Sequence, residues 1–221
     1  IQVALNTGTA GAFSGTQALD YVSTGTGTTT APDISVGTGN VSLSGKVYTP
    51  AVGQIASTTL DFGIVHKGDA VTPQALTVKN SAAVTALNDV LTGSFGGATG
   101  PFTAGGSLGA GLAAQQTDGS SLTASLNTAN AGVFNSAAFV QMQSHNNDMT
   151  DLGRGNVPID LKAQVNNYAL SEFLLKNGAG SFTRSGSTFY LNYGSLHKGT
   201  GVFSTTLLAA NGAAGPADLL D

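Results

Sequence analysis

The sequence has no cysteine and no tryptophan, and only eight Lys or Arg and 12 Asp or Glu among its 221 residues. Without cysteine, disulfides and thiolate zinc sites are excluded. Eight cations and a net charge of −4 provide no basic patch to neutralise a phosphate backbone, which argues against nucleic-acid binding. Glu172 is the only glutamate, so the charged helix surfaces of an ordinary cytoplasmic enzyme have little to be built from.

Long apolar runs are also missing. No run approaches the roughly 20 residues that a membrane-spanning helix needs. Ile1 is not followed by the basic and apolar regions of a signal peptide, so we expect a mature or trimmed chain. Sparse charge combined with abundant Thr, Ser, Asn and Gly is typical of secreted bacterial β-proteins, and we expect an extracellular location on a bacterial cell surface.

Glycine and small apolar residues are plentiful. The chain has 31 glycines, and 41% of its residues are hydrophobic, which is enough to bury a core. Apolar residues alternate with small or polar ones in short stretches, as in half-buried strands: Val41–Tyr48, Ala75–Lys79 and Phe139–Gln143. Turn-forming clusters such as Gly96–Pro101 lie between them. This pattern predicts an all-β fold of the immunoglobulin-like β-sandwich type, without disulfides.

Two segments of the sequence recur. Leu5–Phe13 returns without a gap as Leu126–Phe134, 121 positions further on, and Leu60–Gly68 returns as Leu191–Gly199 at an offset of 131. Asn80 falls on Asn211 at the second offset. Two independent echoes at nearly one period predict tandem modules. The offsets differ by 10 residues, which indicates an insertion in the second repeat.

The echoes divide the chain into four parts. Residues 1–52 are expected to be the second half of an immunoglobulin-like repeat, 53–170 a complete repeat, 171–186 an insertion or linker, and 187–221 the first part of a further repeat. Three explanations are open: the sequence is a piece of a longer array, the true boundaries differ, or the terminal halves complete each other within or between chains.

Completion between chains would be a heterologous, head-to-tail contact, and such contacts generate filaments unless they close. The apolar residues in the two terminal halves are the candidate assembly interface: Ile1, Val3, Leu5, Leu191, Tyr193, Val202 and Leu207.

A polar cluster at 144–151 is the strongest candidate for a metal site. Asn146, Asp148 and Asp151 offer the oxygen ligands that Ca²⁺ prefers, but their spacing does not match the usual calcium loop. The equivalent stretch 22–30 has no carboxylate. A solvated loop is the favoured interpretation, and a calcium site is the alternative; no other cofactor is expected.

Two histidines occupy equivalent repeat positions, and each is followed by Lys-Gly. For His66 and His197 the favoured interpretation is a turn leaving a strand, in which the glycine takes a positive φ. Pairing across modules or metal binding are the alternatives. No nucleophile elbow or phosphate loop is present, and Glu172 has no partner carboxylate in a known motif, so we expect the protein not to be an enzyme.

Several motifs together resemble a known family. Leu60-Asp61-Phe62-Gly63, Leu76-Thr77-Val78-Lys79-Asn80-Ser81, Phe102–Gly106 and Ala131–Phe134 are similar to the bacterial immunoglobulin-like repeats called choice-of-anchor D, found in large surface proteins. The resemblance implies a structural role at the cell surface, in a filament or stalk whose partners are copies of itself or neighbouring repeats. The alternative is an adhesive module that presents loops such as Ser144–Asp151 to a glycan or protein.

Overall fold

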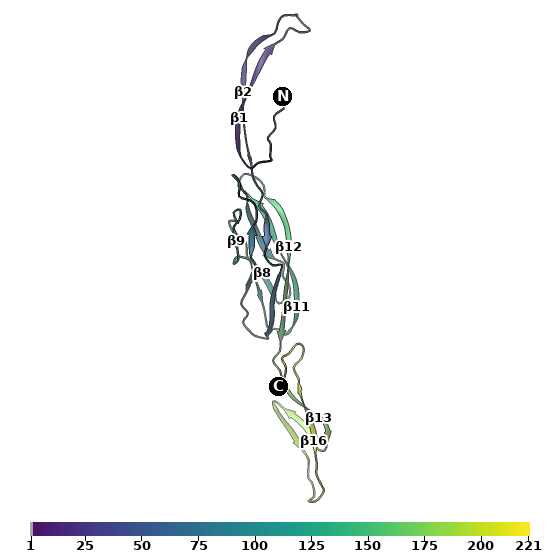
Figure 1. Cartoon of the computed structure of the whole chain (residues 1–221). Coiled ribbons are helices and arrows are strands. Elements are labelled where there is room, and N and C mark those ends of the chain that lie inside the picture. Colours follow the sequence, from purple (N-terminus) through teal and green to yellow (C-terminus); the bar gives the residue numbers. More distant parts are fainter. Residues whose placement is uncertain (1) are drawn as a thin grey trace.

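The computed structural model describes residues 2–221 as an elongated all-β molecule in three parts (Figure 1). A long N-terminal hairpin leads into a central sandwich, residues 49–166, and C-terminal hairpins follow at the opposite end. Residues 2–221 contain no helix, and consequently none long and apolar enough to cross a membrane. The predicted all-β fold without disulfides is confirmed.

One layer of the central sandwich is a four-stranded sheet of order β4-β12-β11-β7. The first strand, β4, runs parallel to β12, and the other neighbours are antiparallel. The strand bounds are β4 (Thr59–His66), β7 (Val90–Gly96), β11 (Gly132–His145) and β12 (Leu152–Asn166). Within the central sandwich, β4 is the first long strand and β12 the last, so their parallel pairing joins the beginning of the sandwich to its end.

The opposite layer consists of two three-stranded sheets, β5-β10-β8 and β3-β6-β9. The segment 74–80 contributes β5 to one sheet and β6 to the other. The strand bounds are β3 (Gly53–Ile55), β5 (Gln74–Ala75), β6 (Val78–Asn80), β8 (Phe102–Gly105), β9 (Thr117–Asp118) and β10 (Thr123–Leu126). Together the two layers form the immunoglobulin-like sandwich that the strand pattern predicts.

The hydrophobic core lies between these layers, inside the central sandwich. Alternate residues of β12 are buried, and they meet Leu76, Val78 and Leu122 of the opposite layer in one cluster. The β12 residues of the cluster are Ile159, Leu161, Ala163 and Val165, each at most 4% exposed. Outside residues 49–166, no hydrophobic side chain of residues 2–221 is buried to this degree.

The N-terminal hairpin consists of β1 (Gly11–Ser23) and β2 (Ile34–Val47), paired along their full length. Its register repeats that of β11 and β12. Gly11 pairs with Val47 as Gly132 pairs with Val165. Each hairpin also carries one bulge, beside the pairs Tyr21–Gly37 and Met142–Gly155, and both glycines have a positive φ. The hairpin thus has the form of β11–β12 without the strands that flank β11–β12 in the sandwich.

The C-terminal hairpins pair β13 (Ser171–Gly178) with β16 (Thr205–Asn211), and β14 (Ser181–Ser185) with β15 (Thr188–Asn192). Ser171 pairs with Asn211 as Gly53 pairs with Asn80 in β3–β6. The strand β13 is longer than β3 and is followed by the additional hairpin β14–β15. Phe189 stacks on Phe182 and receives Arg184 over its ring at 5.2 Å. These contacts form a small apolar cluster in place of a full core.

Candidate functional site: the two junctions of the central sandwich

The chain enters and leaves the central sandwich without a flexible linker. Only five residues separate β2 from β3, and four separate β12 from β13. In the first junction, Thr49 donates to the Leu87 carbonyl at 2.9 Å and accepts from the Asp89 amide at 3.0 Å. In the second, Asn167 does the same with Pro216 and Asp218, at 2.8 and 3.0 Å. The same pair of backbone hydrogen bonds therefore fixes both junctions.

Each junction is also held by an asparagine. Asn80 is fully buried; its side-chain oxygen accepts from the amides of Val52 and Ala82, and its Nδ2 donates to the Leu112 carbonyl at 3.0 Å. The Asn80 side chain thereby bonds three backbone groups from three different segments and fixes their relative positions.

Asn211 repeats this arrangement at the second junction. Its oxygen accepts from the amides of Leu170 and Ala213, each at 3.0 Å, and its Nδ2 donates to the Asp218 carbonyl at 2.7 Å. Unlike Asn80, Asn211 is exposed to solvent. The two bonds that the side-chain oxygen accepts thus occur once inside a completed core and once outside it, whereas the Nδ2 groups donate to carbonyls at different positions.

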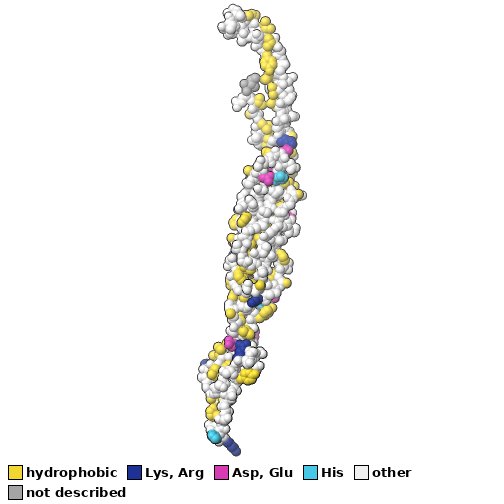
Figure 2. All heavy atoms as spheres, turned by 180° about the vertical axis from the view of Figure 1, so that it is seen from behind, with side chains coloured by type: hydrophobic (Ala, Val, Ile, Leu, Met, Phe, Trp, Pro, Cys, Tyr) yellow, Lys and Arg dark blue, Asp and Glu magenta, His cyan; other side chains and the backbone are white. Residues whose placement is uncertain are grey.

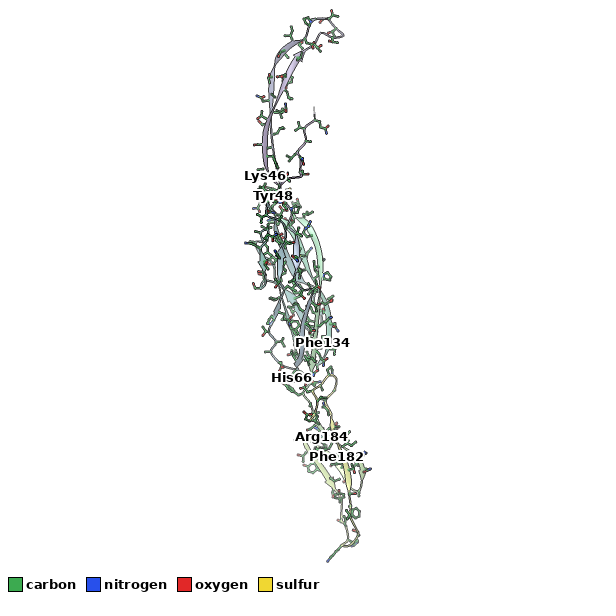
Figure 3. All side chains as sticks on the ribbon, in the orientation of Figure 1. Lys46, Tyr48, His66, Phe134, Phe182 and Arg184 are labelled. Carbon is green, nitrogen blue, oxygen red and sulfur yellow. The ribbon has the colours of Figure 1, made fainter. Side chains whose placement is uncertain are left out.

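Side chains from three elements meet at the first junction, where Figure 3 labels Lys46 and Tyr48. Lys46 Nζ lies 2.6 Å from Asp148 Oδ2, and the Tyr48 hydroxyl donates to the same oxygen. Asp148 belongs to the loop that joins β11 to β12, so this contact ties the N-terminal hairpin to the sandwich. The hydrogen bond to Lys46 lowers the pKa of Asp148, while the bond to Asp148 raises the pKa values of Lys46 and Tyr48.

The buried carboxylate of Asp89 lies next to the loop that carries Asp148. Asp89 is 4% exposed and accepts from Ser144 Oγ and from Asn146 Nδ2, each at 2.7 Å. Ser144 Oγ also accepts from the amide of Ala51 at 2.6 Å. The hydrogen-bonded chain Asn146–Asp89–Ser144–Ala51 therefore anchors the 146–151 loop to the first junction. A buried carboxylate is tolerated only when donors surround it.

The second junction is built around His66, at the opposite end of the sandwich (Figure 3). Its Nε2 lies 2.7 Å from Asp218 Oδ2, and its Nδ1 lies 3.3 Å from Asp69 Oδ2. The imidazole stacks on Tyr168 with 4.6 Å between ring centroids. Asn166 Nδ2 donates to the other oxygen of Asp218 at 3.1 Å. His66 thus joins the sandwich to residues that follow it in the chain.

The predicted turns at His66 and His197 are confirmed, although only the His66 turn leaves a strand directly: β4 ends at His66, whereas β15 ends five residues before His197. Asp69 N donates to the His66 carbonyl, and Thr200 N donates to the His197 carbonyl. Gly68 and Gly199 have φ values of 89° and 88°, the positive φ that the turn requires. The His66 turn also takes part in the second junction, because its imidazole contacts Tyr168 and Asp218.

The calcium candidates lie close together but engage different partners. Asn146 binds Asp89 and the amide of Asp148, Asp148 binds Lys46 and Tyr48, and Asp151 binds His145 at 2.6 Å. Residues 2–221 contain no group of three or more His, Cys, Asp or Glu placed to hold a metal ion. The calcium alternative stays a prediction.

The candidate assembly residues lie at the two ends of the molecule. Ile1 falls outside the described residues. Val3, Leu5, Tyr193 and Val202 are exposed, with Val202 at 96%, and Leu191 and Leu207 are half-buried. None of the six described residues belongs to the core of the central sandwich.

Asp151 offers a direct measurement on the 146–151 loop. The hydrogen bond from His145 to Asp151 raises the pKa of His145. A raised folded-state pKa contributes stability that is complete below the unfolded value, about 6.5, and is lost as the pH rises through the folded value. We therefore expect Asp151→Asn to lower the His145 titration midpoint in a proton NMR titration.

The same titration tests the calcium alternative in the unmodified chain. Because Asp148 is paired with Lys46 and Asp151 with His145, millimolar CaCl₂ is expected to leave the His145 titration midpoint unchanged. A lower midpoint on adding CaCl₂ would favour a calcium site, because the cation would compete with the imidazolium for Asp151. An unchanged midpoint in Asp151→Asn would contradict the pairing itself.

Sequence reasoning missed several junction residues, chiefly Tyr48, Asp89, Tyr168 and Asp218. One signal was available: Asp89 and Asp218 each follow an Asn-containing segment, Asn80 and Asn211, at nearly the same spacing. The contacts of Tyr48 and Tyr168 had no such signal, since their counterparts in the repeat, Asn166 and Pro50, are of other residue types.

Comparisons with known proteins add little to this geometry. No protein-family model matches the sequence. No curated protein matches it. Among solved structures, the chain is similar to the ASH / PapD-like domain of human CEP192 (PapD-like domain 7), with a TM-score of 0.38 and 9% identity over 52% of this chain and 85% of that chain. A TM-score of 0.38 is too low to assign a fold, so the immunoglobulin-like assignment rests on the strand topology of this chain.

Proposed function

We propose that this chain is a segment of an extracellular stalk or filament on a bacterial surface, in which immunoglobulin-like modules of the choice-of-anchor D kind follow one another strand to strand. Its role is structural rather than catalytic. Its partners are neighbouring modules or further copies of the chain. The N-terminal hairpin is then the end of one module, the central sandwich the next module, and residues 167–221 the beginning of a third.

The observation that carries this proposal is the recurrence of one hydrogen-bond pattern at both ends of the sandwich. Thr49 and Asn167 make the same two backbone bonds, and Asn80 and Asn211 cap the same neighbouring groups. A junction used twice in one chain is what an array of like modules requires. Because both junctions are bonded across, a rod built from them resists bending.

The parallel pair β4–β12 supports a role under tension. Both strands run from the first junction toward the second, and their register extends from the pair Thr59–Asp160 to the pair His66–Asn166. Tension applied through the two junctions pulls the start of β4 and the end of β12 in opposite directions. The hydrogen bonds lie across this direction, so the ladder is loaded in shear, with its rungs sharing the force.

The surface composition supports a long-lived extracellular structure. The face in Figure 2 is mostly uncharged, and its few charged side chains gather near the narrow regions between parts and at the tip. Small residues and extended backbone pairing leave few charged loops for proteases. Exposed strand edges remain available for strand addition.

A flexible insertion tests the rod. We expect small-angle X-ray scattering of the chain to fit a stiff rod, because both junctions are hydrogen-bonded across. Inserting Gly-Gly-Ser-Gly between Tyr48 and Thr49 should broaden the distribution of particle lengths by letting the N-terminal hairpin swing. The matched control carries the same insertion between Gly27 and Thr28, in the β1–β2 turn, and should stay stiff. A chain that is already bent or compact without any insertion would overturn the proposal.

A further inference from the structure

The N-terminal hairpin exposes a surface that its counterpart in the sandwich buries. By register, Val41, Leu43, Gly45 and Val47 of β2 correspond to the buried β12 residues Ile159, Leu161, Ala163 and Val165. Val41 is 40% exposed, and the other three are half-buried. Leu5 packs over Gly45 and covers part of this face, leaving an open groove of about 280 Å³ beside Leu43.

The edge of β2 is also unpaired. Within residues 2–221, β2 pairs only with β1, whereas β12 has β11 on one side and β4 on the other. Residues 2–10 form no strand, and Val3, Ala4 and Leu5 line the groove on the face of the hairpin. The strand that β2 lacks is therefore the counterpart of β4.

The far end of the same chain carries this counterpart in a ready conformation. Gly63 of β4 has a φ of 71°, and its amide donates to Asp61 Oδ1 at 2.8 Å. Gly194 has a φ of 72°, and its amide donates to Asn192 Oδ1 at 2.8 Å. The segment 190–197 thus already holds the bend that lets β4 follow β12 past its register shift.

This segment is free to pair. β15 ends at Asn192 with β14 on one edge, and residues 193–197 belong to no strand in the described chain. Tyr193 and Leu196 are exposed, Leu196 at 50%. A free strand with its bend already set has less conformational entropy to lose on pairing.

We infer that residues 190–197 of one copy add in parallel to the β2 edge of a second copy, joining the chains head to tail. The inference rests on the proposed function and identifies the partner segment. Transferring the β4–β12 register places Tyr190 opposite Ser42, Leu191 opposite Leu43, and His197 opposite Tyr48 of the second copy. The contact is heterologous, so repeated addition produces a filament unless it closes into a ring.

The addition covers one edge of the hairpin only. In the sandwich, β7 covers the edge of β11, which is the counterpart of β1. The two terminal parts of the chain contain no counterpart of residues 93–121, which include most of β7. Strand addition therefore leaves the β1 edge open. This asymmetry supplies the control for the experiment, because Thr16 of β1 lies opposite Ser42 on the other strand of the hairpin.

The cysteine-free chain allows a clean cross-linking test. Two single variants, Ser42→Cys and Tyr190→Cys, are mixed under mild oxidation and run on a non-reducing gel. We expect a disulfide-linked dimer, because directly opposed strand residues lie within the Cα separation of about 4.4–6.8 Å that a disulfide spans. The double variant should form a ladder of higher oligomers.

The matched control mixes Thr16→Cys with Tyr190→Cys and should stay monomeric. Equal dimer from both mixtures, or no more dimer than from Ser42→Cys alone, would overturn the inference. Adding Leu43→Asp to the Ser42→Cys chain should reduce the dimer, since it places a charge in the paired edge. A stiff rod in scattering without cross-linking would reject strand addition while leaving the proposed function standing.

Discussion

Replacing Leu161 with alanine is expected to lower the free energy of unfolding of the sandwich by about 3 kcal/mol, the usual cost of a leucine-sized cavity in a core. Leu161 is fully buried in the middle of β12, between the two layers. Its neighbours are held by strand pairing on both sides, through β4 and β11, and cannot collapse into the space. Urea unfolding followed by far-UV circular dichroism measures the loss, and circular dichroism suits a chain without tryptophan.

Leu43 provides the matched control, because it has the same register position in the N-terminal hairpin. At low micromolar concentration, Leu43→Ala should change the free energy of unfolding by less than about 1 kcal/mol, since little surface is taken from water there. Equal losses at both positions would mean that the hairpin already has a completed core, contrary to the open β2 edge.

The second large effect is expected at Gly106. This residue follows β8 with a φ of 104°, and a Cβ atom built on it would lie 1.9 Å from the Ser121 carbonyl oxygen. Gly106→Ala therefore combines an unfavourable φ with a backbone clash that only a shift of the β8–β10 pair could relieve. We expect a loss of roughly 3 kcal/mol in the free energy of unfolding.

The neighbouring glycine serves as the control. A Cβ on Gly105 would meet no atom within 4 Å, and its φ is not positive. Gly105→Ala should therefore stay within about 0.5 kcal/mol of the parent, as surface substitutions usually do. If the two variants unfold at the same urea concentration, the close approach of Gly106 to Ser121 is not present in solution.

Much of the fold could be predicted from local pattern. The alternation in Val41–Tyr48 and Phe139–Gln143 predicts strands, because a strand with one buried face needs apolar residues at every second position. In the structure, 41–47 lie in β2, which ends one residue before Tyr48, and Phe139–Gln143 lie in β11. The His-Lys-Gly turns were also predictable, since glycine reaches positive φ without strain. By contrast, the alternation in Ala75–Lys79 predicts one strand, whereas the structure divides the segment between β5 and β6, with Leu76 and Thr77 in neither. The strand β9 has two residues, too few to show a period.

The candidate site was less accessible to sequence reasoning. Asp148, considered as a calcium ligand, also binds Lys46 and Tyr48, across about 100 positions of sequence. His66, considered as a turn residue, also binds Asp218 and stacks on Tyr168. A turn involves four consecutive residues and is visible in a short window, whereas these contacts depend on which strand ends the fold brings together.

The sequence by itself determined the all-β class, the absence of disulfides, the echo of Leu60–Gly68 at Leu191–Gly199 and the turns within it, because each depends on residue type and local spacing. Only the tertiary structure decided which echo copies are buried. Leu161 and Leu43 sit at the same strand position, yet one is fully buried and the other is not. The physical reason is that a residue is buried only when neighbouring strands cover it. β4 and the opposite layer cover β12, whereas in the described chain no strand lies along the β2 edge.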